Sequence, residues 1–341
     1  MKLITQISLF LVFIVLNFSL NAQAGKLEGS ALRLKFSGVS GFYLSDWEKR
    51  NQDFNLVYSR VIESNWQDQN RATGTRVGAD YYAALKDPLF THLLFGAAIS
   101  DLKGSFPTAR ASDVRVEALN YKGYTRQTEF TFGVVISVFQ EFRVIPKFVH
   151  RSIDQSLTTN KTILIAEGSD FAFIRGKEEY RGRDSSGYFG LALEYDLTPN
   201  LSFYFDSLLF NNVLFLSSGK YSVSGSAEGY LVSGGRVGVS NRIDDSTGNY
   251  KISGNRFSIG SSLKISDSIR LFVSAERDTI FTQISSPFGT NLVIASLLTS
   301  RTVTATTDTI NKTLAENLMY TQKQKFESSL IQIGISKDIN L

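Results

Sequence analysis

Apolar and polar residues alternate in paired runs along this chain, and a short polar break separates the two runs of each pair. In residues 191–206 the alternation continues on both sides of Thr198, Pro199 and Asn200, so that one face is apolar and the other is polar. Successive side chains of a β-strand point to opposite faces, and this pattern therefore predicts a β-hairpin. Proline fixes its own φ and has no N–H to donate, which assigns the break to the turn.

The same pattern predicts ten strands, one near each end of the chain and four hairpins between them. They cover residues 31–37, 75–86, 89–100, 127–139, 143–151, 191–197, 201–206, 256–265, 269–276 and 331–341. Four connections are tight, near Asp87, near Gln140, at 198–200 and at 266–268, and five are long and polar, at about 41–74, 101–126, 152–186, 211–254 and 279–325. Strict alternation of short and long connections is typical of membrane barrels, whereas long structureless loops are unusual in compact soluble domains.

The two faces of these strands differ in a way that indicates which one points inward. One face is Leu, Ile, Val and Phe, and the other is Gly, Ser and Ala with charges of both signs. Lipid accepts bulk but not charge, and the interior of a narrow barrel needs small or mutually paired residues. The sequence thus predicts an all-β, transmembrane, antiparallel up-and-down β-barrel with short periplasmic turns and long extracellular loops. Twelve strands are the alternative, if 162–176 or 228–240 crosses the membrane instead of extending strands above it.

Residues 1–24 have the order of a secretory signal peptide, with Lys2, an apolar run over 9–16 and small residues up to Ala24. Cleavage after Ala24 would leave a single barrel domain, 25–341. The chain has no Cys and therefore no disulfide, and its formal charge of +4 is too mild to indicate nucleic acid as a partner. A soluble periplasmic β-protein is the alternative for such an exported chain.

With these features the chain resembles the class of bacterial outer-membrane β-barrel proteins. The resemblance is carried by the signal peptide, the hairpin "YDLTPNLSFYF" at 195–205 and the terminal strand "SLIQIGISKDINL" at 329–341. The class usually ends its last strand with an aromatic residue, which resembles a recognition tag for the assembly machinery. Here Leu341 is last, and Lys337 interrupts the apolar face. The resemblance implies a location in the outer membrane of a Gram-negative (diderm) bacterium, contact with its lipid, and assembly through the C-terminal strand.

Inward parity selects eight basic and seven acidic side chains as lumen candidates. They are Arg33, Lys35, Arg76, Asp80, Glu129, Arg143, Lys147, Arg151, Glu194, Asp196, Asp206, Lys264, Arg270, Glu276 and Asp338. Charges so nearly balanced in a narrow interior should pair across the lumen, because an unpaired buried charge is costly. This favours a filled interior. A narrow small-solute channel is the alternative, favoured by glycines on the same face at 78, 96, 133, 190, 260 and 334.

The chain has two histidines, and their predicted positions test whether it could be an outer-membrane protease or lipase. A protease site of this kind needs a His–Asp pair near the outer rim, but His92 is predicted near the periplasmic end. A lipase needs Ser beside His on the lipid-facing wall, and His150 with Ser152 or Ser156 is the candidate. The sequence has no metal-spaced His or Cys cluster, P-loop or calcium-loop pattern. We therefore predict no enzyme, and no catalytic, cofactor-binding or metal-binding residue.

The long connections hold more residues than the predicted wall, and such segments usually carry interactions. We expect a structural or surface-interaction role through them, with extracellular ligands or small solutes as candidate partners. The sequence does not identify the ligand.

Overall fold

The computed structural model describes residues 29–42, 63–64, 71–112, 115–167, 170–210, 218–231, 236–285, 292–293 and 324–340. The predicted signal peptide and its cleavage after Ala24 lie outside the described residues. So do most of the predicted connections 41–74 and 279–325. In the described part of the chain, no helix is long and apolar enough to cross a membrane.

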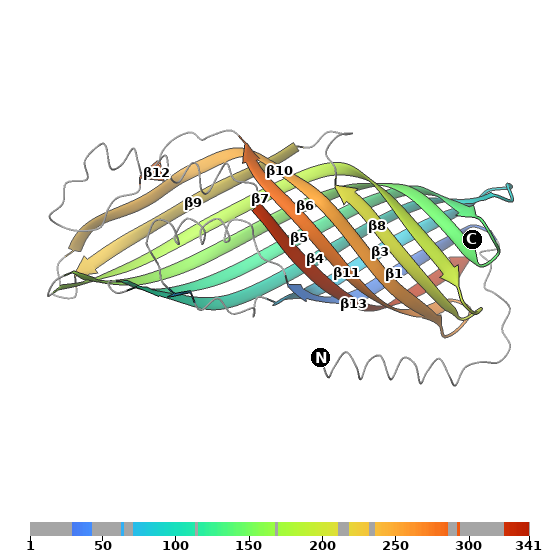
Figure 1. Ribbon diagram of the computed structural model, residues 1–341, viewed down its shortest axis with the longest axis horizontal. Helices are drawn as coiled ribbons and strands as arrows, with labels where there is room; N and C mark the ends of the chain where they lie inside the picture. Colours follow the sequence, from blue (N-terminus) through green and yellow to red (C-terminus); the bar gives the residue numbers. More distant parts are fainter. Residues whose placement is uncertain are drawn as a thin grey trace.

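Ten antiparallel strand positions close into a barrel (Figure 1). Around the wall they are β1 (Ala31–Phe42), β3 (Arg71–Ala84), β4 (Phe90–Ser112), β5 (Arg115–Ser137), β6 (Phe142–Glu167), β7 (Asp170–Asp196), β8 (Leu201–Phe210), β10 (Arg236–Lys264), β11 (Ile269–Ser285) and β13 (Gln324–Asn340). Pairing of β10 with β11 and of β13 with β1 completes the ring. The predicted ten-stranded barrel is confirmed, and the twelve-stranded alternative is wrong.

One wall position is shared by two strands in succession. β8 pairs with β7 over Phe189–Asp196, and β9 (Ser218–Leu231) pairs with β7 over Ala172–Ser185. Both also pair with β10 on their other side. β9 therefore continues the line of β8 instead of adding an eleventh position. The short strands β2 (Glu63–Ser64) and β12 (Leu292–Val293) pair with β4 and β10.

The strands at one end of the barrel are much longer than predicted. The hairpins β4–β5, β6–β7 and β9–β10 continue as paired strands far beyond the rest of the wall, and they form the long end of the molecule in Figure 1. Segments 101–126 and 152–186, and most of 211–254, were expected to be loops, and this expectation is wrong. The described residues of 162–176 and 228–240 belong to strands that extend above the barrel, as the sequence also allowed.

The cause of this error is an inversion of the hydrophobic phase along each long strand. In β5 the outward residues Phe130 and Phe132 are exposed, whereas further along the inward residues Leu119 and Tyr121 are buried. In β4 the exposed Ile99 is followed by the buried Leu102. The strand continues without interruption, but its apolar side changes from lipid to interior. The exchange occurs next to Ile99, Phe130, His150 and Gly187, where we set the limit of the membrane-spanning segments.

Candidate functional site in the barrel lumen

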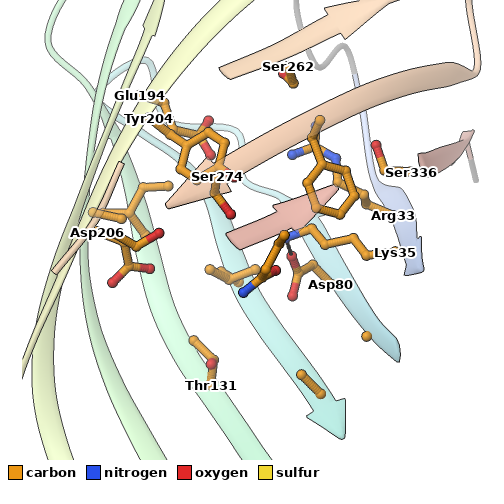
Figure 2. A pocket seen from close by; sticks show the side chains of 18 of the residues that line it. Arg33, Lys35, Asp80, Thr131, Glu194, Tyr204, Asp206, Ser262, Ser274 and Ser336 are labelled. Atoms are coloured by element: carbon orange, nitrogen blue, oxygen red, sulfur yellow. Dashed lines mark ion pairs between the residues drawn. The ribbon is translucent and has the colours of Figure 1, made fainter. Parts of the chain in front are cut away.

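The inward side chains of the wall surround one cavity of about 230 Å³. Its lining includes the predicted lumen candidates Arg33, Lys35, Arg76, Asp80, Glu129, Arg143, Lys147, Glu194, Asp206, Arg270 and Glu276. Figure 2 shows Arg33, Lys35 and Asp80 on one side of this space and Glu194, Tyr204 and Asp206 on the other. The strand alternation that turns the apolar residues outward brings these charges together.

The remaining candidates lie elsewhere. Arg151 and Asp196 are buried and paired, as described below. Lys264 forms its ion pair with Asp267 at 3.0 Å, inside the tight turn after β10, so that pair does not cross the lumen. For Asp338 the described part is the backbone, in register with Arg33 of β1.

Toward the tight turns, the ion pairs run along the wall. Lys35 pairs with Asp80 on the neighbouring strand (dashed in Figure 2). Arg143 contacts Glu194 at 3.1 Å and Asp196 at 3.0 Å, both on the neighbouring β7. Lys147 of β6 pairs with Asp206 of β8. Pairs of this kind leave the middle of the lumen open, and the cavity lies between them.

Toward the long hairpins, the ion pairs cross the lumen. Arg256 of β10 pairs with Glu129 of β5 at 2.5 Å, although three wall strands separate them on the shorter side. Arg151 of β6 pairs with Asp278 of β11 at 3.2 Å, and both side chains are only 1% exposed. Arg76 joins the network through Glu129 at 2.6 Å and Glu276 at 3.5 Å. We call these residues, which come from five strands, the ion layer: Arg76, Glu129, Arg151, Arg256, Glu276 and Asp278.

Two members of the ion layer were missing from the predicted set. Arg256 and Asp278 both have the inward parity of their strands. Arg256 is the first residue of the predicted strand 256–265, and Asp278 lies two residues beyond the end of the predicted strand 269–276. The same alternation continues for two residues beyond Glu276 in β11, and this signal points to Asp278. Arg256 was overlooked although its position has the same parity as Ser258.

Apolar side chains close the lumen on the far side of the ion layer. Val39, Ala72, Leu102 and Leu330, from four strands, form a buried cluster there. Near the tight turns, Tyr82, Leu94, Val135 and Ile145 form a second buried cluster. The cavity thus lies in a lumen filled by layers, charged and apolar in turn.

The inward glycines do not leave the free space that a channel would need. A Cβ added at Gly260 would lie 2.4 Å from a ring carbon of Tyr204, because that ring already lies over the glycine. A Cβ added at Gly96 would lie 2.7 Å from a carboxylate oxygen of Asp80. These glycines accommodate neighbouring side chains that project into the lumen.

The two histidines lie at opposite ends and on opposite faces of the wall. His92 is buried at the turn end, where its Nε2 is 3.1 Å from the carbonyl oxygen of Gly29. His150 faces outward at the limit of the apolar band, and its Nε2 is 3.0 Å from Oγ of Ser185 on β7. The serine beside His150 is therefore Ser185, and not the sequence neighbours Ser152 or Ser156. No group of three potential metal ligands occurs among the described residues.

One buried acid lies just beyond the membrane-spanning segment of β7. The side chain of Asp184 points inward, and its Oδ2 accepts hydrogen bonds from Ser186 at 3.2 Å and from Tyr188 at 3.3 Å. Burial raises the pKa of Asp184 to about 6, because the charged form loses its hydration. It is an acid that titrates close to neutral pH.

Comparison with known proteins finds no matching family model and no matching curated protein. Solved barrels are similar at low identity. The outer membrane protease OmpT of Escherichia coli has 11% identity and a TM-score of 0.40, with 92% of this chain and 98% of that chain covered. The toluene transporter TodX of P. putida has 10% identity and a TM-score of 0.32, with 92% of this chain and 90% of that chain covered. The outer membrane phospholipase A of E. coli has 10% identity and a TM-score of 0.28, with 94% of this chain and 92% of that chain covered. At these values the similarities say nothing about what this chain binds or does. By its own strand pairing, the chain is a closed β-barrel of the kind that bacterial outer-membrane proteins have.

Proposed function

We propose that this chain is an integral outer-membrane barrel with a closed lumen, and that its extended hairpins serve as a structural and surface-interaction platform. Export by residues 1–24 and assembly through β13 belong to this proposal. The apolar band of the wall contacts lipid, and an up-and-down barrel of ten strands has an interior that side chains can fill.

The observation that carries the proposal is the ion layer. Its pairs join strands on opposite sides of the barrel, so they block the path that an ion or solute would take. The apolar cluster around Leu102 follows directly beyond it. Buried ion pairs of this kind are costly to break, because each partner left alone is an unpaired charge in a low-dielectric interior.

The length of the hairpins supports the second half of the proposal. Six strand segments, from β4 through β7 to β9 and β10, continue past the membrane band as one paired sheet. A preformed sheet binds a partner with less loss of chain entropy than a flexible loop does.

Planar-bilayer conductance of the refolded protein tests the closed lumen. Insertion is verified first by heat-modifiable mobility on gels, so that silence cannot come from missing protein. We expect no stable single-channel steps from the wild type. Stable steps that change when Arg143 or Lys147 is neutralised would contradict the closed lumen and support the narrow channel, for which the 230 Å³ cavity is the favourable observation.

A lipid-ester hydrolase is the second candidate function, and the Ser185–His150 contact favours it. In such a reaction Oγ of Ser185 would attack an acyl carbonyl carbon while its proton passes to Nε2 of His150. The ester alcohol would leave with that proton, and water would then hydrolyse the acyl-serine. Fatty-acid release from phosphatidylcholine vesicles tests it, with Ser185→Ala against the neighbouring Ser152→Ala as control. Equal release by both variants and wild type would eliminate this candidate.

A further inference from the structure

The outward face of the barrel changes abruptly from apolar to charged where the long hairpins begin. Ile99, Phe130 and Phe189 are exposed in the apolar band. Ile99 is in register with the outward polar residues Thr128, Ser152 and Ser185 of the next three strands, which form the last row of the band. The next step is a row of charges across five neighbouring strands: Asp101, Arg126, Asp154, Arg183 and Lys220.

A second polar row follows directly above this one. It holds Lys103, Tyr124, Ser156 and Arg181, again in register. We call the two rows together the outer belt. The outer belt contains five basic and two acidic residues, and this side of the barrel therefore carries an excess of positive charge.

Both acids of the outer belt are already engaged. Asp101 accepts hydrogen bonds from Nε of Arg126 and from the hydroxyl of Tyr124, each at 2.8 Å. The hydrogen bond from Arg126 holds the pKa of Asp101 below its ordinary value, so this carboxylate stays ionised and keeps the guanidinium in place. Asp154 pairs with Arg183 at 2.8 Å.

The cations of the outer belt remain accessible. The side chains of Arg126 and Arg183 are 55% and 71% exposed although each makes an ion pair. Among the described residues Lys103, Arg181 and Lys220 make no ion pair. Lys103 and Arg126 both lie over the ring of Tyr124, at 5.8 and 5.7 Å, which holds two cations next to each other.

We propose that the outer belt binds the phosphate group of an anionic lipid whose acyl chains lie against the apolar band below. This inference rests on the proposed membrane location, and it names the lipid chemistry that this surface fits. In a bilayer, phosphates lie just outside the hydrocarbon region, which is where the outer belt lies relative to the exposed Ile99 and Phe130, two residues before Asp101 and four residues after Arg126. Arginine and lysine donate several hydrogen bonds to phosphate oxygens, and arginine can do so in a bidentate manner.

The test measures lipid selectivity at the surface of the inserted protein. The full barrel is refolded into phosphatidylcholine bilayers that contain a trace of spin-labelled phosphatidic acid or spin-labelled phosphatidylcholine, and electron spin resonance gives the immobilised fraction of each. We expect a severalfold preference for phosphatidic acid that weakens with added salt, because exposed charges are screened. Arg181→Gln/Arg183→Gln should reduce that preference at least twofold.

A matched control separates position from net charge. Arg175→Gln/Lys177→Gln removes two exposed charges from the same face of the same strand. Lys177 lies six residues beyond Arg183, about 20 Å further from the membrane along the strand. This variant should retain the wild-type preference. Equal losses in both variants, or no preference in the wild type, would overturn the proposal. Failure of the wild type to insert would instead contradict the membrane location itself, so the two failures are distinguishable.

Discussion

At the scale of single residues, burial determines what an ion pair contributes to this barrel. Arg151 and Asp278 are 1% exposed, whereas Arg183 and Asp154 are 71% and 44% exposed. Removing one member of a buried pair leaves an uncompensated charge, which costs about 3–5 kcal/mol, and an exposed pair contributes about 0–1 kcal/mol. We therefore expect Arg151→Ala to lower the free energy of unfolding by several kcal/mol and Arg183→Ala to change it little. Urea titration of heat-modifiable mobility in vesicles measures both, and similar midpoints for the two variants would contradict the ion layer.

The raised pKa of Asp184 predicts a pH dependence of stability. A carboxyl group whose pKa is about 6 in the folded chain, above its unfolded value, binds more protons when folded. Its contribution to stability therefore increases as the pH falls through 6, and levels off near the unfolded pKa, about 3.9. Asp184→Asn mimics the neutral form and can still accept the hydrogen bonds of Ser186 and Tyr188. Thermal melts between pH 8 and pH 4 should show this variant more stable than wild type at pH 8 by about 3 kcal/mol, with the difference shrinking toward pH 4. A constant difference would show that Asp184 does not titrate in this range.

At the scale of the strand, alternation predicted the barrel but not the full length of its strands. All ten strands that cross the membrane band were predicted, because lipid and lumen select opposite side chains there, although some were predicted too short, as β8 was before the exposed Leu209. Beyond the band the pattern persists with its faces exchanged, as between the exposed Phe130 and the buried Tyr121 of β5. A strand that is predicted from one continuous apolar face therefore ends where the two faces exchange. For the same reason Asp278, beyond the predicted end of its strand, was not identified.

The ion layer was predictable in kind but not in its pairing. Near balance of inward charges indicated that they would neutralise one another. Which charges meet depends on strand order, tilt and register, and these place Glu129 opposite Arg256 although 127 residues separate them along the chain. Asp80 meets its partner Lys35 on an adjacent strand, and only such local pairs follow from neighbouring hairpins.

The assignment of the two faces of β10 to lipid and lumen can be tested with one pair of substitutions. Ile259 faces outward and is 63% exposed, and Ser262 lines the cavity. An arginine facing the bilayer midplane costs about 2–4 kcal/mol, whereas one in the polar lumen can contact acidic groups such as Glu194 or Asp206. Ile259→Arg should therefore reduce folding yield into vesicles more than Ser262→Arg does. Equal yields would mean that the two faces are not distinguished by lipid.

At the scale of the whole molecule, all long hairpins of the described chain emerge at one end and all tight turns at the other (Figure 1). In outer-membrane barrels the short turns face the periplasm and the long segments face outward. The outer belt and the extended sheet would then lie on the cell surface, and the cavity would lie nearer the periplasm. The proposed interaction role requires this orientation.

The absence of cysteine from the sequence makes the orientation directly measurable. Single cysteines are placed at Lys177, on the extended sheet, and at Asp267, in the tight turn after β10, both on exposed side chains. A membrane-impermeant maleimide added to intact cells should label Lys177→Cys and leave Asp267→Cys unlabelled until the outer membrane is permeabilised. Because both positions are exposed, a difference in labelling reports the side of the membrane and not local burial. The opposite pattern would place the extended sheet in the periplasm, and the surface role would then have to be abandoned while the barrel itself remained.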